Sequence, residues 1–480
     1  MLSVLVYTLG CKLNQLESEA LSGSFMQAGF SFFSASAGES PSVIIINTCT
    51  VTSKADQKAR RVIRKALRDY PDSPVLVTGC YAQLDKERLI ALDPCRDGME
   101  RLFVLKGMEK DALLDLPRCL GEKKDIRGAL KILCGEERES ANSGRAAGRF
   151  QFNPERFSDR ARSFLKIQDG CDNHCTYCRI RLARGPSVSL DAKLALERLR
   201  VLEKNYAEAV ITGVNICRYR DAPDINSLGE LLDYLLAGTA KITLRLSSLA
   251  PESIDEDFAR ILSNKRIRPH FHLSVQSASE KILERMGRSY NAQTVEKAVS
   301  LLRGAKGDPF LACDIITGFP GETETEFEKT RNMCEKTGFA WTHIFPYSGR
   351  PGTPAWSFSD AVPEKEISRR VKILTDLAWQ GRGRYIKRWL GREVEALVEK
   401  GKISKSSCRA VSENYLKLLV VFNGEKTPLP GSVLRCVLLE EQDLSKEQAI
   451  FSADCDAIAS ALPRNLADFT KQAILELNES

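Results

Sequence analysis

Six short apolar runs, each followed by a helical pattern, constrain the fold of this chain more than any other feature. They are Phe164–Ile167, Ala209–Thr212, Ile242–Leu246, Phe271–Val275, Leu311–Ile316 and Trp341–Phe345. Short runs of this composition are typical of buried parallel strands, and intervening helices are the usual crossovers between such strands. Six units predict an α/β fold with an open or partial (βα)6 barrel, whose reactive groups lie at the carboxyl ends of the strands.

The N-terminal part of the chain predicts a second, smaller α/β unit. Helical spacing covers Asn14–Ala28 and Ser53–Arg68, with Asn14 and Ser53 as expected N-caps. These segments alternate with the strand-like runs Val4–Tyr7, Val43–Ile46 and Val75–Val77. The order predicts a doubly wound parallel sheet.

The C-terminal part predicts a small β-barrel. A basic helical stretch, Ile367–Leu390, precedes strand-like runs at Val394–Val398, Tyr415–Phe422 and Val433–Leu439. We therefore expect an N-terminal domain (1–134), an exposed linker that buries little surface (135–162), a (βα)6 domain (163–383), the small barrel (384–445) and a helical tail (446–480).

Cysteine content bounds the cellular setting. The 480 residues include 15 cysteines, and Leu2–Cys11 lacks the positive segment of a signal peptide, so we interpret it as a buried strand. Without export, the cysteines are expected to be thiols of a cytoplasmic protein. No run of 18 apolar residues occurs, which argues against a membrane partner. The net charge of +7 is too mild to indicate a ligand.

Three cysteines are clustered in a C-x3-C-x2-C motif just after the first strand of the (βα)6 array. Cys171, Cys175 and Cys178 can hold three irons of a cubane cluster and leave one iron open for a ligand. The alternatives are a zinc site or redox thiols, but no second Cys or His pair at zinc spacing follows. His174, between two of the cysteines, is expected to face solvent or backbone.

Three further cysteines are far apart in sequence but equivalent in topology. Cys11, Cys49 and Cys80 each follow one of the three predicted N-terminal strands, whose carboxyl ends share one edge of the sheet. They could form a second three-ligand cluster site or be buried core thiols, and the pattern leaves both interpretations open. The other nine cysteines show no metal spacing, although Cys217 also follows a strand end.

These motifs resemble those of the radical S-adenosylmethionine (SAM) enzymes, and the dispersed cysteines narrow the resemblance to the methylthiotransferases. It extends from Tyr7 to about Leu439. Further matching segments are Phe164–Cys171, Ala183–Gly185, Thr212–Asn215, Leu246–Ser248, Gly318–Thr323, Phe345–Ser348 and Gly352–Ala355.

The resemblance implies two [4Fe–4S] clusters, held by Cys11, Cys49 and Cys80 and by Cys171, Cys175 and Cys178, together with SAM. In this family the loop cluster reduces SAM to a radical that removes an unactivated hydrogen, and the other cluster supplies or binds the sulfur. SAM is then expected near Gly213, Asn215, Ser247, Gln276 and Gly318, any of which could instead serve a turn or a cap.

The sequence motifs around the dispersed cysteines favour one branch of the family. GCKLNQLESE, NTCTVT and GCYAQ resemble the enzymes that modify threonylcarbamoyladenosine in tRNA, rather than those acting on isopentenyladenosine or on a ribosomal protein. The implied partners are the tRNA anticodon loop and an electron donor such as a flavodoxin or ferredoxin, with the sulfur source unidentified. The C-terminal barrel resembles the RNA-binding TRAM module.

Two departures from the family pattern and two basic stretches complete the prediction. Arg181 replaces a usual proline within Arg179–Leu182, and Ser274–Ser279 lacks a usual proline and glycine. Basic residues concentrate in Lys54–Arg68 and Tyr385–Lys405, which could contact RNA phosphates or simply be solvated helix faces. A non-catalytic, metal-stabilised RNA-binding protein remains the rival interpretation, but structural metal sites are closed, unlike two sets of three ligands.

Overall fold

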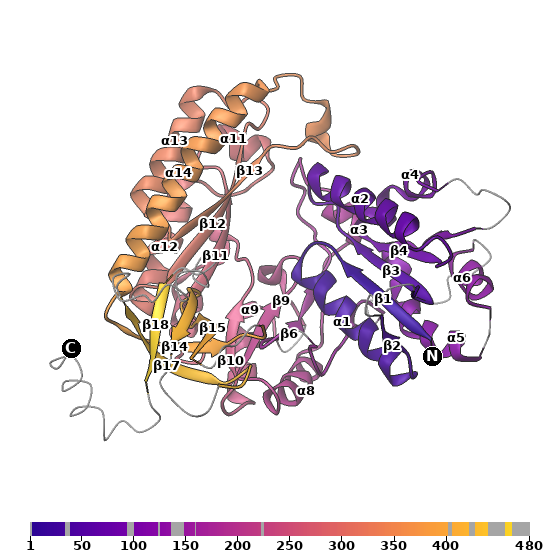
Figure 1. Ribbon diagram of the computed structural model, residues 1–480. Helices are drawn as coiled ribbons and strands as arrows, with labels where there is room; N and C mark the ends of the chain where they lie inside the picture. Colours follow the sequence, from indigo (N-terminus) through magenta and orange to yellow (C-terminus); the bar gives the residue numbers. More distant parts are fainter. Residues whose placement is uncertain are drawn as a thin grey trace.

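The N-terminal sheet is parallel throughout, with strand order β2-β1-β3-β4-β5 (Figure 1). The computed structural model describes residues 2–33, 39–93, 100–122, 125–135, 148–158, 160–221, 225–401, 406–421, 428–439 and 457–462. The strands are β1 (Ser3–Thr8), β2 (Ser31–Phe32), β3 (Val43–Thr48), β4 (Val75–Gly79) and β5 (Leu102–Val104). The predicted doubly wound sheet is confirmed.

Helices cover both faces of this sheet because alternate strand residues point to opposite sides. Ile45 packs with residues of α1 (Lys12–Gln27), whereas Ile44 packs with residues of α2 (Ser53–Asp69). The remaining helical segments here are α3 (Cys80–Leu84), α4 (Lys86–Ile90), η1 (Gly107–Leu114), α5 (Leu116–Glu122) and α6 (Ile126–Cys134).

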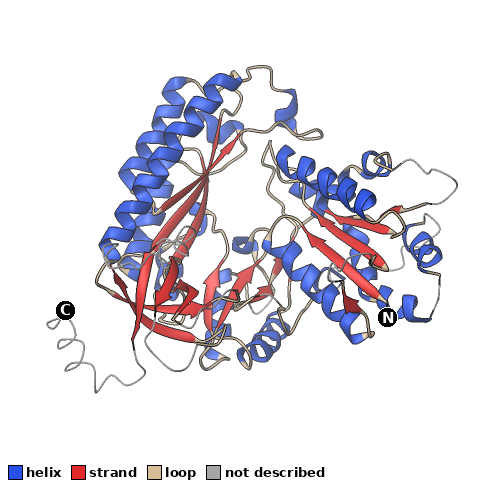
Figure 2. Cartoon of the chain, viewed as in Figure 1, coloured by secondary structure: helices blue, strands red, loops and turns tan. Residues whose placement is uncertain are grey.

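All six predicted strands of the (βα)6 array are present (Figure 2). They form two three-stranded parallel sheets, β10-β9-β6 and β11-β12-β13, which approach each other through isolated bridges such as Leu249 to Leu273. Their bounds are β6 (Ser163–Lys166), β9 (Glu208–Thr212), β10 (Thr243–Leu246), β11 (His270–Gln276), β12 (Phe310–Thr317) and β13 (Trp341–Pro346). The predicted partial barrel is therefore confirmed.

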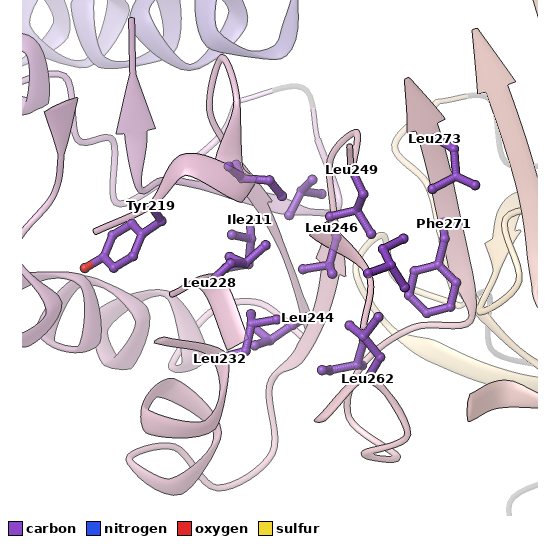
Figure 3. Packing of buried hydrophobic residues seen from close by; sticks show 14 of the residues in the cluster. Ile211, Tyr219, Leu228, Leu232, Leu244, Leu246, Leu249, Leu262, Phe271 and Leu273 are labelled. Carbon is purple, nitrogen blue, oxygen red and sulfur yellow. The ribbon is translucent and has the colours of Figure 1, made fainter. Parts of the chain in front are cut away.

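Helices on the outside of this array bury its apolar side chains. Figure 3 shows Ile211, Leu246 and Phe271 from three different strands packed with helix residues. The helical segments are α7 (Ile180–Arg184), α8 (Ala192–Glu203), η3 (Ile216–Arg218), α9 (Leu228–Ala237), η4 (Pro251–Ser253), α10 (Glu256–Leu262), α11 (Glu280–Arg285), α12 (Ala292–Lys306), α13 (Glu324–Thr337) and η5 (Pro354–Ser357). A short ribbon, β7 (Gln168–Asp169) with β8 (Val188–Ser189), precedes α8.

The long helix α14 (Glu364–Trp389) leads into a closed β-barrel of order β14-β15-β16-β18-β17. These strands are β14 (Glu393–Val398), β15 (Ser407–Ser412), β16 (Lys417–Val421), β17 (Val433–Leu439) and β18 (Ala457–Leu462). The predicted small barrel is confirmed, but the predicted helical tail is wrong at β18, which pairs with β16 and β17 and closes the barrel. The other tail residues lie outside the described residues.

The predicted exposed linker also needs correction. Residues 136–147 lie outside the described part, but 148–158, with its short helix η2 (Gly148–Phe150), contains the buried rings Phe150, Phe152 and Phe157. These rings join the core of the (βα)6 domain, because the sparse apolar residues of a charged segment can still anchor it to a neighbouring core. In the part of the chain that the structure describes, no helix is long and apolar enough to cross a membrane.

Candidate functional site

The carboxyl edge of the N-terminal sheet brings Cys11, Cys49 and Cys80 together. Cys11 caps α1 after β1, Cys49 directly follows β3, and Cys80 begins α3 directly after β4. β1 and β4 both pair with β3, so the three cysteine-bearing loops are neighbours. Cys49 and Cys80 are buried, whereas Cys11 is exposed.

Two glycines permit the close approach of these loops. Gly10 has φ of +105°, and a Cβ there would lie 2.4 Å from the Cβ and 2.9 Å from the Sγ of Cys49. Gly79 has φ of +99°, and a Cβ there would lie 2.3 Å from the carbonyl oxygen of Thr48. Any larger residue would push the thiol-bearing loops apart.

Asn14 holds the same edge rather than capping a helix. Its Nδ2 donates to the carbonyl oxygens of Leu9, at 2.7 Å, and Thr48, at 2.9 Å. The predicted N-caps at Asn14 and Ser53 are both wrong, because Cys11 precedes α1 and Thr52 caps α2 by accepting from the Ala55 N–H. Asn14 is instead fully buried as a cross-link between two strand-end loops.

The second thiol-bearing loop lies between β7 and α7. Gly170 begins it with φ of +70°, where a Cβ would lie 1.9 Å from the Pro186 carbonyl oxygen. The Asn173 N–H donates to Cys171 Sγ at 3.4 Å, and the Ile180 N–H donates to Cys178 Sγ at 3.5 Å. Such N–H···S bonds stabilise thiolates bound to iron.

Residues after β11 fix the outer side of this loop. Thr176 donates its N–H to the Met286 carbonyl oxygen at 3.0 Å, and a Cβ on Gly287 would lie 2.9 Å from the His174 carbonyl oxygen. Arg288 donates to the Tyr177 hydroxyl at 2.9 Å. The loop is therefore preorganised by a distant part of the sequence.

Burial disfavours the ionised form of two of these thiols. Among the described residues, no three Cys, His, Asp or Glu side chains are close enough to hold one metal ion. Burial raises the pKa of both Cys49 and Cys178 to about 11, so metal binding there must release protons.

A cavity of about 300 Å³, which we call the upper cavity, lies between the Cys171 loop and the residues that follow Cys49. Cys171, Cys175 and Cys178 line it, as do Val51 and Thr52, whereas Cys11, Cys49 and Cys80 do not. A pocket of this size suits a small organic cofactor. The cavity therefore lies at the carboxyl ends of the strands, where the (βα)6 pattern predicts the reactive groups.

Two of the five residues predicted to contact SAM line the upper cavity, namely Asn215 and Gln276. Gln276 has φ of +65°, one of two positive values among the described non-glycine residues. A strained backbone persists only where the surroundings enforce it, and such residues concentrate at functional sites. A break in register between β11 and β12, from Leu273 to Gln276, accompanies this conformation.

The other three, Gly213, Ser247 and Gly318, are not among the residues lining the upper cavity. A Cβ on Gly213 would lie 2.9 Å from the Gln168 carbonyl oxygen, and Gly318, with φ of +80°, packs against Ile367. Close packing therefore explains why a glycine stands at each of these two positions.

Sequence reasoning missed Ser248, Arg288 and Asp314, which also line the upper cavity. Ser248 could have been predicted, since it lies in the matching LSS segment just after β10, whereas Asp314 lies within β12 and carries no such signal. Arg288 follows a helix and carries no such signal.

The departures from the family pattern have local explanations. Arg179 is buried and forms an ion pair with Asp85 of the N-terminal domain, with 3.0 Å between Nη1 and Oδ2. Arg181 contacts the exposed ring of His174, at 2.7 Å from Nδ1, which confirms the predicted solvent-facing position. Ala278 is not among the positive-φ residues, so no glycine is required there.

Buried charges connect the two domains beside the Cys11 edge. Arg184 of α7 donates to Asn14 Oδ1 at 3.0 Å, Glu17 Oε1 at 3.2 Å and Asp169 Oδ1 at 3.1 Å. Lys110 pairs with Glu17, and Lys166 pairs with Asp169 at 2.6 Å. Burial alone would raise the pKa of Glu17, but Arg184 and the two lysines lower it to about 2.

Cys217 remains outside the thiol sites. It lies in η3, accepts the Ala250 N–H at 3.3 Å and does not line the upper cavity, and burial raises its pKa. Of the other eight cysteines, 95 and 455 lie outside the described residues.

The basic stretches differ in their surroundings. Six of the seven basic residues of Lys54–Arg68 are exposed on α2, and the seventh, Arg60, donates to the Tyr81 hydroxyl at 2.6 Å. In the second stretch, Arg388 pairs with Asp308 at 3.0 Å and Lys400 donates to the Phe157 carbonyl oxygen at 2.9 Å. Residues 402–405, with two of its lysines, lie outside the described residues. The four described basic residues of the second stretch are exposed as well, so both stretches present cationic surface.

Comparisons with known proteins agree with this geometry. The model of "Uncharacterized protein family UPF0004" matches residues 3–99, and that of the radical SAM superfamily matches residues 165–334. A threonylcarbamoyladenosine tRNA methylthiotransferase from Treponema pallidum is 40% identical, over 91% of this chain and 98% of its own length. One from Thermotoga maritima is 34% identical, over 87% and 91%.

A protein of a different branch is less similar. A tRNA-2-methylthio-N(6)-dimethylallyladenosine synthase from Anaplasma phagocytophilum is 29% identical, over 82% of this chain and 86% of its own length. With both family models placed on the two cysteine-bearing domains and relatives matched over nearly their full length, the chain belongs to the radical SAM methylthiotransferase family.

Proposed function

We propose that this chain adds a methylthio group to carbon 2 of the adenine ring of threonylcarbamoyladenosine in tRNA. Relatives that are 40% and 34% identical are named for this activity, and a relative named for the dimethylallyladenosine branch is 29% identical. The single structural observation that carries the proposal is the upper cavity, which residues of the Cys171 loop and of the Cys49 loop line together.

Two [4Fe–4S] clusters and SAM supply the chemistry that no side chain can, namely removal of an unactivated hydrogen and delivery of sulfur and methyl. We assign Cys171, Cys175 and Cys178 to one cluster and Cys11, Cys49 and Cys80 to the other. Asn215 and Gln276 would orient SAM by hydrogen bonds from the wall of the upper cavity. The remaining predicted contacts, Gly213, Ser247 and Gly318, would act only by shaping the adjoining loops.

The RNA would contact the C-terminal barrel and the N-terminal domain. The closed C-terminal barrel supports a TRAM-like RNA-binding role for this module, and the exposed basic face of α2 would contact phosphates. Anticodon loops offer unpaired bases that can turn into a cavity. We further propose that the protein works in the cytoplasm, with a flavodoxin or ferredoxin as electron donor, since free thiols and iron–sulfur centres need a reducing compartment.

The test is mass spectrometry of tRNA nucleosides from cells that lack this protein, with and without the gene restored. The proposal expects the methylthio derivative of threonylcarbamoyladenosine to disappear and to return with the wild-type chain, but not with a Cys175→Ser variant. Persistence of that derivative while a methylthio derivative of isopentenyladenosine disappears would overturn it.

A further inference from the structure

A second, larger cavity of about 850 Å³ lies between the (βα)6 array and the C-terminal barrel, and we call it the lower chamber. None of the six cysteines lines it. Its walls come from β11, β12, β13, α14 and the C-terminal barrel, with Lys12 of α1 at one side. Its volume is that of a pocket for an organic molecule of nucleotide size or larger.

The register of the strands places the lower chamber next to the upper cavity. Residues two apart on a strand share a face. On β12, Phe310 and Ala312 line the lower chamber, and Asp314 lines the upper cavity. On β13, His343 lines the lower chamber and Phe345 lines the upper cavity. The two cavities therefore follow one another along the same face of β12 and β13.

Several aromatic rings line the lower chamber. Trp341 and Trp379 meet edge to face, with ring centroids 5.0 Å apart, and Trp379 is 61% exposed. The rings of His272 and His343 are stacked 5.2 Å apart. Tyr415 of the C-terminal barrel adds a ring 4.0 Å from that of His270. An exposed ring such as that of Trp379 provides a stacking surface for a planar group.

Positive charge accompanies the rings. Among the described lining residues, four side chains are cationic and one is a carboxylate, that of Glu399; the cationic ones are Lys12, Arg382, Arg409 and Lys417. Arg409 and Lys417 lie on adjacent barrel strands, β15 and β16. Arg382 lies over the ring of Phe310, 4.6 Å from its centroid. The chamber thus combines a charge suited to phosphate with rings suited to bases.

We propose that the lower chamber binds an unpaired nucleotide of the tRNA strand, adjacent to the nucleotide that reacts in the upper cavity. Its base stacks on Trp379, and its phosphates contact the barrel cations Arg409 and Lys417. Stacking on aromatic rings beside a cationic track is how proteins hold single-stranded nucleic acid. This proposal rests on the proposed function and deepens it by assigning a second RNA contact.

The test measures the binding of a fluorescein-labelled anticodon stem-loop RNA to the full chain by fluorescence anisotropy. Trp379→Ala is expected to weaken binding about 5- to 100-fold. Lys417→Ala is expected to lower the slope of log affinity against log salt by about 0.7. The matched control is Phe32→Ala, which removes a ring 45% exposed on β2, the edge strand of the N-terminal sheet, and is expected to leave affinity unchanged.

A second readout locates the contact. In a stem-loop that carries 2-aminopurine beside the target nucleotide, wild-type protein should quench the probe by stacking, and Trp379→Ala should not. The chamber assignment alone would be overturned if the wild-type chain binds the stem-loop but neither variant differs from it. In that case Trp379→Ala keeps the wild-type affinity and quenching, and Lys417→Ala keeps the wild-type salt slope. Failure of the wild-type chain to bind the stem-loop would instead overturn the tRNA substrate, and the chamber assignment with it.

Discussion

Replacing Arg184 should loosen the contact between the N-terminal domain and the (βα)6 domain. Arg184 is 7% exposed and donates to Asn14, Glu17 and Asp169. Arg184→Met keeps much of the side-chain volume but removes the charge and all three contacts. Breaking a buried ion pair by removing one partner costs about 3–5 kcal/mol.

The lower end of that range applies here. Without Arg184, Glu17 keeps Lys110 and Asp169 keeps Lys166 at 2.6 Å, so neither carboxylate is left without a cation. We therefore expect a loss of about 3 kcal/mol in the free energy of unfolding. Arg184→Lys should lose less, because it keeps the charge but not the planar fork that reaches several acceptors.

The assay is urea-induced unfolding followed by circular dichroism. The matched control is Arg68→Met, since Arg68 pairs with Asp69 at 3.0 Å but its side chain is 75% exposed. An exposed pair contributes about 0–1 kcal/mol. If Arg184→Met were no more destabilising than Arg68→Met, the reasoning that this network joins the domains would be refuted.

Three further predictions concern the charge network, the cysteine edge and the upper cavity. The pKa of Glu17 falls from 4.5 to about 2 on folding, so the stabilisation by its carboxylate is complete above pH 4.5 and is lost as pH falls through 2. Urea unfolding at a series of pH values should therefore show the stability difference between wild type and Glu17→Gln vanishing over that window. A difference that does not depend on pH would contradict this. Gly79→Ala places a Cβ 2.3 Å from the Thr48 carbonyl oxygen. It should lower the iron content after reconstitution by about half, while the cluster of Cys171, Cys175 and Cys178 is retained. An unchanged iron content would show that the position of Cys80 is not critical. Gln276→Gly relieves the strain of a φ of +65° but adds the entropy cost of a glycine, so the free energy of unfolding should change by no more than about 1 kcal/mol. The same variant should bind SAM more weakly, as measured by calorimetry. Equal SAM affinity would show that Gln276 is not part of the site.

Periodicity predicted most of the fold because the buried strands are short, apolar and separated by helices. The six runs of the (βα)6 array and the three N-terminal runs all form strands. β15 and β18 were missed, since Ser407–Ser412 is polar and Ala457–Leu462 is rich in alanine and serine. Only pairing with distant strands makes such segments extended, and a local pattern does not carry that information.

The site was predictable to the level of loops but not of individual side chains. Topology was enough to bring Cys11, Cys49 and Cys80 to one edge, because parallel strands end on the same side. Which neighbour faces the upper cavity depends on register: Ser248 lines it and Ser247 does not. Arg184 and Arg288 were missed because their partners come from sequence positions far away.

Iron analysis after anaerobic reconstitution tests the central claim, that two separate sets of three cysteines each hold a cluster. The wild-type chain should contain about eight irons and eight sulfides. A variant with Cys11, Cys49 and Cys80 changed to serine should retain about four, and so should a variant with Cys171, Cys175 and Cys178 changed. About four irons in the wild-type chain, lost entirely in one triple variant and unaffected in the other, would contradict the claim.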